Sequence, residues 1–544
     1  MILFIRIFTK IPINKEVNYF NNTMSNVKSE QLFNLIKALS KGEKRFFKLY
    51  VSRLGAIADK KFIILFDAIE KQKEYNETKI LVREKALNPK QLPNLKTHLY
   101  FQLLKSLRLG NSNSLSSIKL LELIDYSRLL YSKCLYKECV KMIDKAKRMA
   151  VTNDQSIFLL EILELEKLVI SKTLDEGNEE RVNNIIDETI KVTKSIQNIN
   201  IFSNLSLKLD SYYTKSGFVR NKKDLNKVTR FFNDSLPAYD LKKISFHEKL
   251  YLYKSYVSFY FFIQDFKLGY TYATKLVELF EKQIEMKALK PEMYIKALNS
   301  LLAAQNKLYK FKEFTETLKQ LIAIKREKKI ILTENLNLNL FKAIYIHEIN
   351  RHFMLGEFKS GTRIVGALEH ELHKIVTKLD KHSILLLYYK IACLYFGSGN
   401  YRVALTWLNK ITNEREIALR EDLHSFARIL SLICHFELEN DDLVESYIKS
   451  TYRFFIKKGD LSLYQKHILD FLKRLLMESE IKNVKKRFIL LKDQMESLHK
   501  NKFEKRAFLY FDIISWLESK IEKRPVQAII KEKALLKLKS VEVV

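Results

Sequence analysis

Apolar residues recur at intervals of three and four positions along most of the chain, the spacing that gathers them on one face of an α-helix. A clear example is the run HSILLLYYKIACLYF, which precedes Gly397 and is followed by a short polar turn and a second amphipathic segment from Tyr401. This pattern predicts two helices joined by a turn, in which Gly399 takes a positive φ angle after the first helix. A phosphate-binding loop is not predicted, because no strand precedes the glycines and no Lys-Ser or Lys-Thr pair follows them.

The same unit recurs through the chain as a helix, a polar turn, one aromatic or aliphatic residue, and a second helix. We take the residue after the turn as an anchor, and expect it to begin the second helix and to be buried against the first. Consecutive anchors lie 41 to 48 residues apart. The anchors are Tyr136, Val182, Leu225, Phe266, Phe314, Phe358, Tyr401, Leu443 and Val484. Such a regular spacing is typical of a solenoid of helix pairs that bury their apolar faces against one another.

Small residues occupy the positions where the two helices of a pair would cross. Ala392 and Ala404 lie on either side of the turn described above, and Gly269 and Ala273 follow the turn at Phe266. In this arrangement the units resemble tetratricopeptide repeats, although their period of about 43 residues exceeds the 34 of that family and the closing proline is mostly missing. The resemblance implies an all-α, right-handed superhelical array of helix hairpins, a divergent TPR-like α-solenoid whose first helices line a concave binding surface.

The N-terminal region lies outside this repeat and is separated from it by the polar stretch LGNSNSLSS. Its pattern predicts four helices, at about residues 28–39, 41–53, 60–73 and 77–108, with the last interrupted by Asn88-Pro89 and Pro93.

We therefore divide the chain into four parts. Residues 1–23 are a disordered or wrongly assigned start, because amphipathic helix begins only with Met24. Residues 24–115 form a helical N-terminal module, which either caps the array or has helix-turn-helix character. Residues 116–522 form the TPR-like array, and residues 523–544 form a basic C-terminal tail or helix.

Composition supports the all-α class, since 12 glycines and 6 prolines in 544 residues supply too few tight turns for strand-rich or doubly wound folds. The four cysteines form no C-x-x-C pair, which fits a reducing, cytoplasmic compartment. No stretch reaches about 18 uncharged apolar residues, so we expect no transmembrane helix.

The net positive charge of the chain leaves binding to nucleic acid as a second possible function. The net charge of +32 suits a polyanionic partner such as nucleic acid, or less directly a membrane surface, although an AT-rich coding sequence also favours the abundant Lys, Asn, Ile and Phe. Residues 24–117 carry 18 Lys+Arg and 8 Asp+Glu, a net +10. If this module reads DNA, the residues expected to contact the groove or the phosphates are Lys90, Lys96, His98 and Lys105.

No catalytic motif appears in the sequence. The histidine pairs His347/His352 and His370/His373 are five and three residues apart, whereas a zinc-protease helix needs four. Nucleophile elbows, Walker loops and dinucleotide fingerprints are absent from the sequence. We therefore predict no catalytic residue, no cofactor and no metal.

The function predicted from these features is a non-enzymatic scaffold or adaptor that binds a peptide or protein on the concave surface of the array. The resemblance to tetratricopeptide repeats implies that the first helix of each pair lines this surface. The predicted groove residues are Lys254, Ser258, Phe261, Asn299, Asn306, Tyr309, Asn350, Phe353, Tyr389 and Phe396. Amide and ammonium donors among aromatic rings suit the backbone, carboxylates and side chains of an extended peptide. The alternative is a transcription regulator, with a DNA-binding N-terminal module and an array that senses a peptide.

Overall fold

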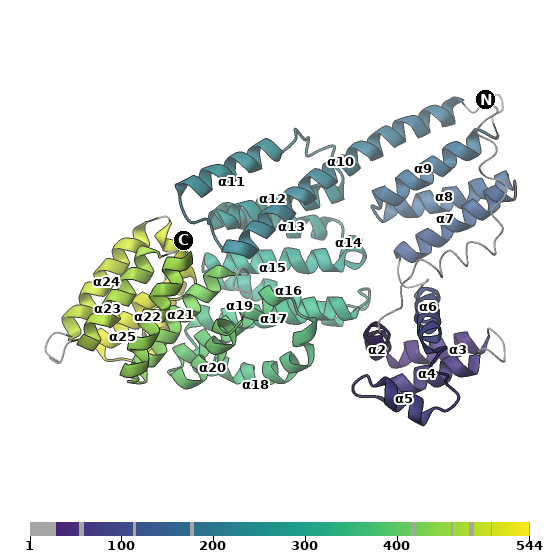
Figure 1. Cartoon of the computed structure of the whole chain (residues 1–544). Coiled ribbons are helices and arrows are strands. Elements are labelled where there is room, and N and C mark those ends of the chain that lie inside the picture. The colour runs from purple at the N-terminus through teal and green to yellow at the C-terminus, as the bar shows by residue number, and fades with distance from the viewer. Residues whose placement is uncertain are drawn as a thin grey trace. The chain divides into compact units, whose positions relative to one another are not determined.

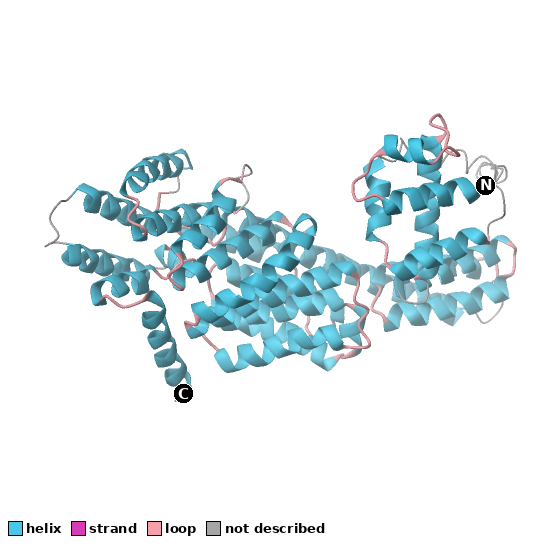
Figure 2. Cartoon of the chain, turned by 90° about the horizontal axis from the view of Figure 1, so that it is seen from below, coloured by secondary structure: helices cyan, strands magenta, loops and turns pink. Residues whose placement is uncertain are grey.

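The computed structural model of the chain describes residues 29–53, 59–111, 116–173, 179–414, 420–458, 461–477, 484–501 and 503–542. These residues are almost entirely helical and none of them forms a strand, as Figure 2 shows. The all-α prediction is therefore confirmed, whereas the predicted start at residues 1–23 lies outside the described residues.

The chain forms two compact units, each of which we describe by itself. The first comprises residues 1–149 and 168–173, and the second residues 150–167 and 174–544. The division at residue 115 rests on the repeat pattern and stays a prediction.

In the first unit, the N-terminal helices follow the predicted pattern closely. They are α2 (Ser29–Ala38), α3 (Lys41–Ser52), α4 (Asp59–Lys71), α5 (Glu77–Arg83) and α6 (Leu92–Gly110). Ser40 and Glu43 form a capping box that starts α3, and Pro93 lies in the first turn of α6. The predicted break before residue 93 thus separates α5 from α6. Helix α6 packs on α2, α3 and α4, and Leu99 and Leu103 are fully buried there.

Two further helices in this part of the chain form the first predicted pair, α7 (Ser116–Ser132) and α8 (Tyr136–Thr152). The thiol of Cys139 is buried and donates a hydrogen bond to the carbonyl of Ser127 at 3.2 Å, so it acts as a packing residue between them.

The second unit continues with helices that pack on their neighbours in chain order, and Figure 1 shows α13, α15, α16 and α17 side by side. Its helices are α9 (Ser156–Ile170), whose last turn belongs to the first unit, α10 (Glu179–Ser216), α11 (Lys222–Ser235), α12 (Phe246–Phe262), α13 (Phe266–Lys282), α14 (Glu285–Leu289), α15 (Pro291–Lys307), α16 (Phe311–Ala323), α17 (Glu334–Leu355), α18 (Phe358–Ile375), α19 (Lys381–Gly397), α20 (Tyr401–Thr412), α21 (Glu421–Glu437), α22 (Asp441–Lys458), α23 (Leu463–Met477), α24 (Val484–Lys500), α25 (Ile513–Glu522) and α26 (Val526–Glu542). The described residues between these helices also include the 3₁₀ turns η1 (Ile324–Arg326), η2 (Val376–Lys378) and η4 (Glu504–Leu509).

The anchors begin helices as predicted. Five of the nine are the first residue of a helix, and the other four lie within the first four residues. Their burial is less complete than predicted, since only Phe314 and Phe358 are buried and six others are partly buried. At Leu443 the prediction was wrong, because its side chain is 47% exposed and its neighbour Val444 is buried instead. A second difference is α10, a single helix of 38 residues that runs past the place where a turn between two units was expected.

The turn between α19 and α20 forms as predicted. Gly399 has φ +83°, and the Asn400 side chain accepts a hydrogen bond from the amide of Val403 at 3.3 Å, which starts α20. Gly397 allows a close approach, since a Cβ atom there would lie 2.3 Å from Cδ1 of Phe358. Ala404 is fully buried, as expected at a close helix crossing.

The second unit also makes contacts between helices that are far apart in sequence. The amide of Arg420 donates to the carbonyl of Thr214 at 3.1 Å, and Arg220 forms an ion pair with Glu421 at 3.1 Å. Near the C-terminus, α26 packs on α17, and the amide of Lys359 donates to Oε1 of Gln527 at 2.9 Å. Helices of this unit that are far apart in the sequence are therefore in direct contact.

Candidate ligand-binding surface

The predicted groove residues lie on α12, α15, α17 and α19, except Tyr309, which lies two residues beyond the end of α15. On α12, two of them are already engaged by α10. The Lys254 ammonium lies 3.3 Å from Oδ2 of Asp210, and the Ser258 hydroxyl donates to Oδ1 of the same residue at 2.7 Å. Phe261 packs edge-on against Phe266, with 5.7 Å between ring centroids.

A chain of hydrogen-bonded polar side chains joins α15, α17 and α19, each of which is the first helix of its predicted pair. Nε2 of His347 on α17 lies 2.9 Å from Oδ1 of Asn299 on α15, and its Nδ1 lies 3.2 Å from Nδ2 of Asn350. Oδ1 of Asn350 accepts a hydrogen bond from the Lys390 ammonium on α19 at 2.6 Å. Burial, and secondarily the charge of Lys390, lowers the pKa of His347 to about 3. The ring is therefore neutral, with its proton on Nε2 because Nδ1 accepts from the amide.

The aromatic groove residues of α19 contact a segment from the C-terminal part of the chain, residues Leu509, Tyr510 and Phe511, which we call the 509–511 segment. The hydroxyl of Tyr389 donates to the carbonyl of Tyr510 at 3.4 Å, and the rings of Phe396 and Phe511 pack edge-on with centroids 5.0 Å apart. Both α19 side chains are consequently buried. The predicted surface is thus partly filled by the protein's own chain.

The remaining groove residues border this region. Tyr309 has φ +55° and is 41% exposed, and the ammonium of Lys537 lies 3.9 Å from its ring centroid. The ring of Phe353 lies 5.5 Å from the Lys390 ammonium. Asn306 is partly buried, and its side chain makes no hydrogen bond with the residues that the structure describes.

Two lysines on this surface have lowered pKa values. Lys307, the last residue of α15, donates a long hydrogen bond of 3.4 Å to the carbonyl of Leu509. Burial, followed by the charge of Lys390, lowers its pKa to about 7. Burial also lowers the pKa of Lys390 to about 8. Within the described ranges, no carboxylate forms an ion pair with either ammonium.

A buried ion pair lies where α21 meets α10. Arg420 and Asp422 are both almost fully buried and form a bidentate pair, with Nε–Oδ1 at 2.8 Å and Nη2–Oδ2 at 2.6 Å. The hydroxyl of Tyr510 also donates to Asp422. Burial opposes ionisation of Asp422, but the charge of Arg420 and these hydrogen bonds outweigh it and lower the pKa of the carboxyl. Nη1 of Arg420 finds no acceptor in the part of the chain that the structure describes.

The four candidate DNA contacts in the first unit do not share one environment. Lys96 is buried and binds the carboxylate of Glu77 and the hydroxyl of Ser29, so its ammonium holds the helices together. Lys90, His98 and Lys105 are exposed, and His98 packs against the ring of Phe62.

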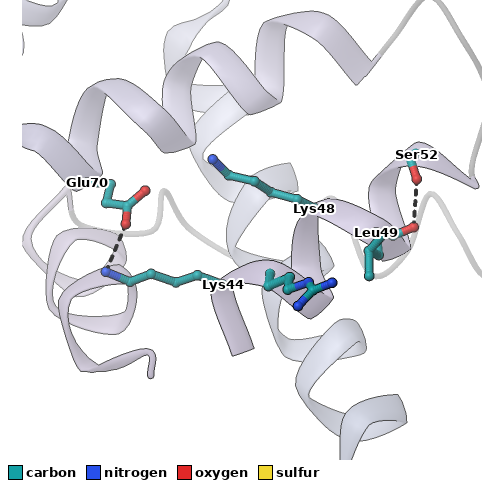
Figure 3. A pocket seen from close by; sticks show the side chains of 6 residues that line it. Lys44, Lys48, Leu49, Ser52 and Glu70 are labelled. Carbon is teal, nitrogen blue, oxygen red and sulfur yellow. Dashed lines mark hydrogen bonds and ion pairs between the residues drawn. The ribbon is translucent and has the colours of Figure 1, made fainter. Parts of the chain in front are cut away.

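A cationic hollow lies elsewhere on the same unit, along α3. It is lined by Lys44, Arg45, Lys48, Leu49, Ser52 and Glu70, as Figure 3 shows. Lys44 pairs with Glu70 at 3.0 Å and Lys48 with Asp67 at 2.8 Å, so the acidic side chains of α4 compensate two of its three positive charges.

Neither a metal centre nor a membrane span is visible among the described residues. No group of three or more His, Cys, Asp and Glu side chains there could hold an ion, and no described helix is long and apolar enough to cross a bilayer. His347 is held by the two asparagines, and His352 lies 3.3 Å from the Ser360 hydroxyl. The side chain of His373 lies outside the described residues.

No protein-family model and no curated protein matches this sequence. The architecture of consecutive helices packed on their neighbours is compatible with a helical-repeat solenoid.

Proposed function

We propose that this protein is a non-enzymatic scaffold or adaptor, and that its TPR-like, right-handed superhelical array binds a peptide segment of a partner protein on the surface of its first helices. The observation that carries the proposal is the contact between this surface and the 509–511 segment. Lys307 and Tyr389 donate to two consecutive backbone carbonyls of that segment, and Phe396 packs on the ring that follows. Donors for backbone carbonyls combined with aromatic contacts for side chains are the chemistry that a peptide ligand requires. The segment itself follows a turn, since Leu509 is the last residue of η4.

The TPR-like assignment rests on the even anchor spacing and on the small residues at helix crossings. Ala392 and Ala404 are both fully buried, which supports close approach of α19 and α20. A cytoplasmic location is part of the proposal, and the four free cysteines fit it.

Site-specific photo-crosslinking tests the proposal. A benzophenone amino acid replaces Tyr309, beside the groove, or Tyr452 on α22, which has the same exposure of 41%. In native lysate we expect nuclease-resistant protein adducts from position 309 and few from position 452. Equal adducts at both positions, or adducts that all disappear with nuclease, would contradict the proposal.

The transcription-regulator alternative is favoured by one observation, the exposed positions of Lys90 and Lys105 on a unit that also carries the α3 hollow. Basic side chains on the surface of a small helical unit are what binding to phosphates requires.

A further inference from the structure

The outer side of α3 carries positive charge that its surroundings neutralise only in part. The helix and the residue that follows it contain five basic residues, Lys41, Lys44, Arg45, Lys48 and Arg53. Lys44 and Lys48 pair with carboxylates of α4, as described above. The other three side chains are exposed and form no ion pair with the residues that the structure describes. An anionic partner would therefore meet three uncompensated charges on this helix.

The cations of α3 share one surface with the hollow described above. Arg45 and Lys48 are three positions apart, so they lie on the same side of the helix, and both line this hollow of about 440 Å³ (Figure 3). Lys37 of α2 adds a further cation at its edge, since its ammonium donates to the carbonyl of Glu70, which also lines the hollow, at 2.6 Å. We call the exposed side of residues 41–53 the α3 patch.

Two large apolar side chains are exposed among these cations. Leu49 is 52% exposed and lines the hollow, and Phe46 is 40% exposed. They are three positions apart and therefore lie on one side of α3. Part of the Phe46 ring rests on α6, because a Cβ atom at Gly110 would lie 3.3 Å from it. Exposed apolar groups bordered by polar ones mark a surface that meets a protein or a membrane.

We infer that the α3 patch binds the surface of an anionic phospholipid membrane. The basic side chains would contact the headgroup phosphates and carboxylates, while Phe46 and Leu49 enter the boundary between headgroups and acyl chains. Helices that bind at this boundary combine Lys and Arg with Phe and Leu in the same way. Lys41 and Arg53 are about 18 Å apart along the helix, so an extended anionic surface can engage both at once, whereas a single small anion cannot.

The two apolar side chains favour a membrane over a nucleic acid as the partner. A phosphodiester backbone attracts cations but gives Leu49 no apolar surroundings, whereas the membrane boundary offers both. The net charge of +32 acts in the same direction, since attraction of the whole chain to an anionic surface adds to the contacts of the patch. Membrane binding goes beyond the proposed scaffold function and does not depend on it.

Flotation of the full chain with lipid vesicles tests the inference. The probes are vesicles of phosphatidylcholine alone and vesicles in which phosphatidylserine replaces one-third of it, at one ionic strength. The charge variant is Lys41→Gln/Arg45→Gln, and its control is Lys79→Gln/Lys85→Gln, which removes two exposed lysines on and after α5. We expect wild type and the control to float only with the phosphatidylserine vesicles, and the charge variant to bind them at least about tenfold more weakly.

A second pair of variants tests the apolar contact. Leu49→Ser should weaken binding to the phosphatidylserine vesicles about fivefold, because less apolar surface leaves water on binding. Leu129→Ser is the control, since this leucine is 62% exposed on α7 and lies outside the patch. All these side chains are exposed, so equal melting temperatures of the variants should confirm that each one folds. If the charge variant melts below wild type, Arg53→Gln at the exposed end of α3 takes its place.

Three results would overturn the inference. The first is no binding to phosphatidylserine vesicles, or equal binding of wild type and the charge variant. The second is binding that falls with the charge variant but not with Leu49→Ser, while affinity for duplex DNA falls by the same factor, since this would assign the patch to nucleic acid. The third is release of the protein from the vesicles by low concentrations of hexaglutamate, which would assign the patch to an acidic peptide.

Discussion

Tyr510 and Asp422 are 88 residues apart in the sequence and are joined by the hydrogen bond that the tyrosine hydroxyl donates to Oδ2 of the aspartate. The same oxygen accepts from Nη2 of Arg420, so one carboxylate holds the C-terminal part of the chain to the start of α21. Since Arg420 is 1% exposed, its charge depends on Asp422 for compensation.

The substitution Asp422→Asn should therefore lower the free energy of unfolding by about 3–5 kcal/mol, because it leaves a buried guanidinium without a counter-charge. Chemical denaturation measures this loss. Glu445→Gln is the control, since it breaks the exposed pair with Lys449 and should leave stability unchanged within error. A loss below about 1 kcal/mol at Asp422 would mean that water reaches the pair.

A second prediction concerns Gly217, which has φ +74° and faces the same carboxylate. A Cβ atom there would lie 2.7 Å from Oδ2 of Asp422, so Gly217→Ala should cost about 1–3 kcal/mol through backbone strain and displacement of the ion pair. Gly366→Ala in α18 is the matched control, because nothing lies within 4 Å of its added methyl group. That variant should be stabilised by up to about 1 kcal/mol. Equal effects of the two substitutions would refute the strained geometry at Gly217.

The close crossing of α19 and α20 gives a third prediction. Ala404 is fully buried, so Ala404→Leu should destabilise the protein by about 1–3 kcal/mol through overpacking. The control is Ala323→Leu at the exposed end of α16, which should change the melting temperature little. An unchanged melting temperature for Ala404→Leu would show that the crossing has room for three more carbons.

Stability should depend on pH through Lys307 and Lys390, which form no ion pair with the described residues. An ordinary lysine has a pKa of 10.5, whereas that of Lys307 is lowered to about 7 and that of Lys390 to about 8. Between these values and about 10 the unfolded chain binds more protons than the folded one, so the free energy of unfolding rises with pH. The melting temperature of wild type should therefore increase relative to that of Lys307→Met/Lys390→Met as the pH is raised from about 7 to about 9.5. A difference that stays constant or decreases would show that both amines keep ordinary pKa values.

The last prediction addresses DNA. If the scaffold function is right, binding of the full chain to duplex DNA should be weak and independent of sequence, and Lys90→Gln/Lys105→Gln should leave the salt dependence nearly unchanged. A fall of about one in the log–log salt slope for each lysine, together with discrimination between sequences, would favour the regulator instead. Titrations at several salt concentrations measure this slope.

Local features of the fold could be predicted from the sequence because they depend on neighbouring residues. The helices of the first unit follow from apolar spacing and from Pro93, and the φ angle of Gly399 follows from the polar turn. The uninterrupted α10 was missed, although residues 179–216 contain no glycine or proline that would end a helix.

The surroundings of the candidate site depend on contacts that no local pattern contains. The sequence period predicted a helix that contains Tyr389 and Phe396, but it did not reveal the segment that covers them. Contacts of that segment, such as the one between Lys307 and Leu509, join residues 202 positions apart. Lys390 did carry a visible signal, since it is the one charged residue in the apolar run that forms most of α19.

The contact between α10 and α21 also restricts how this array can evolve. Arg220 and Glu421 are 201 residues apart, and they meet only because the helices between them complete one circuit of the chain. Open solenoids gain and lose whole repeats easily, since each repeat touches only its neighbours. Here the duplication or deletion of one hairpin between these residues would carry α21 away from α10 and expose Arg420 and Asp422. The number of repeats within the circuit is therefore fixed by its closure, and adaptation to new partners must proceed by substitution on the existing helices.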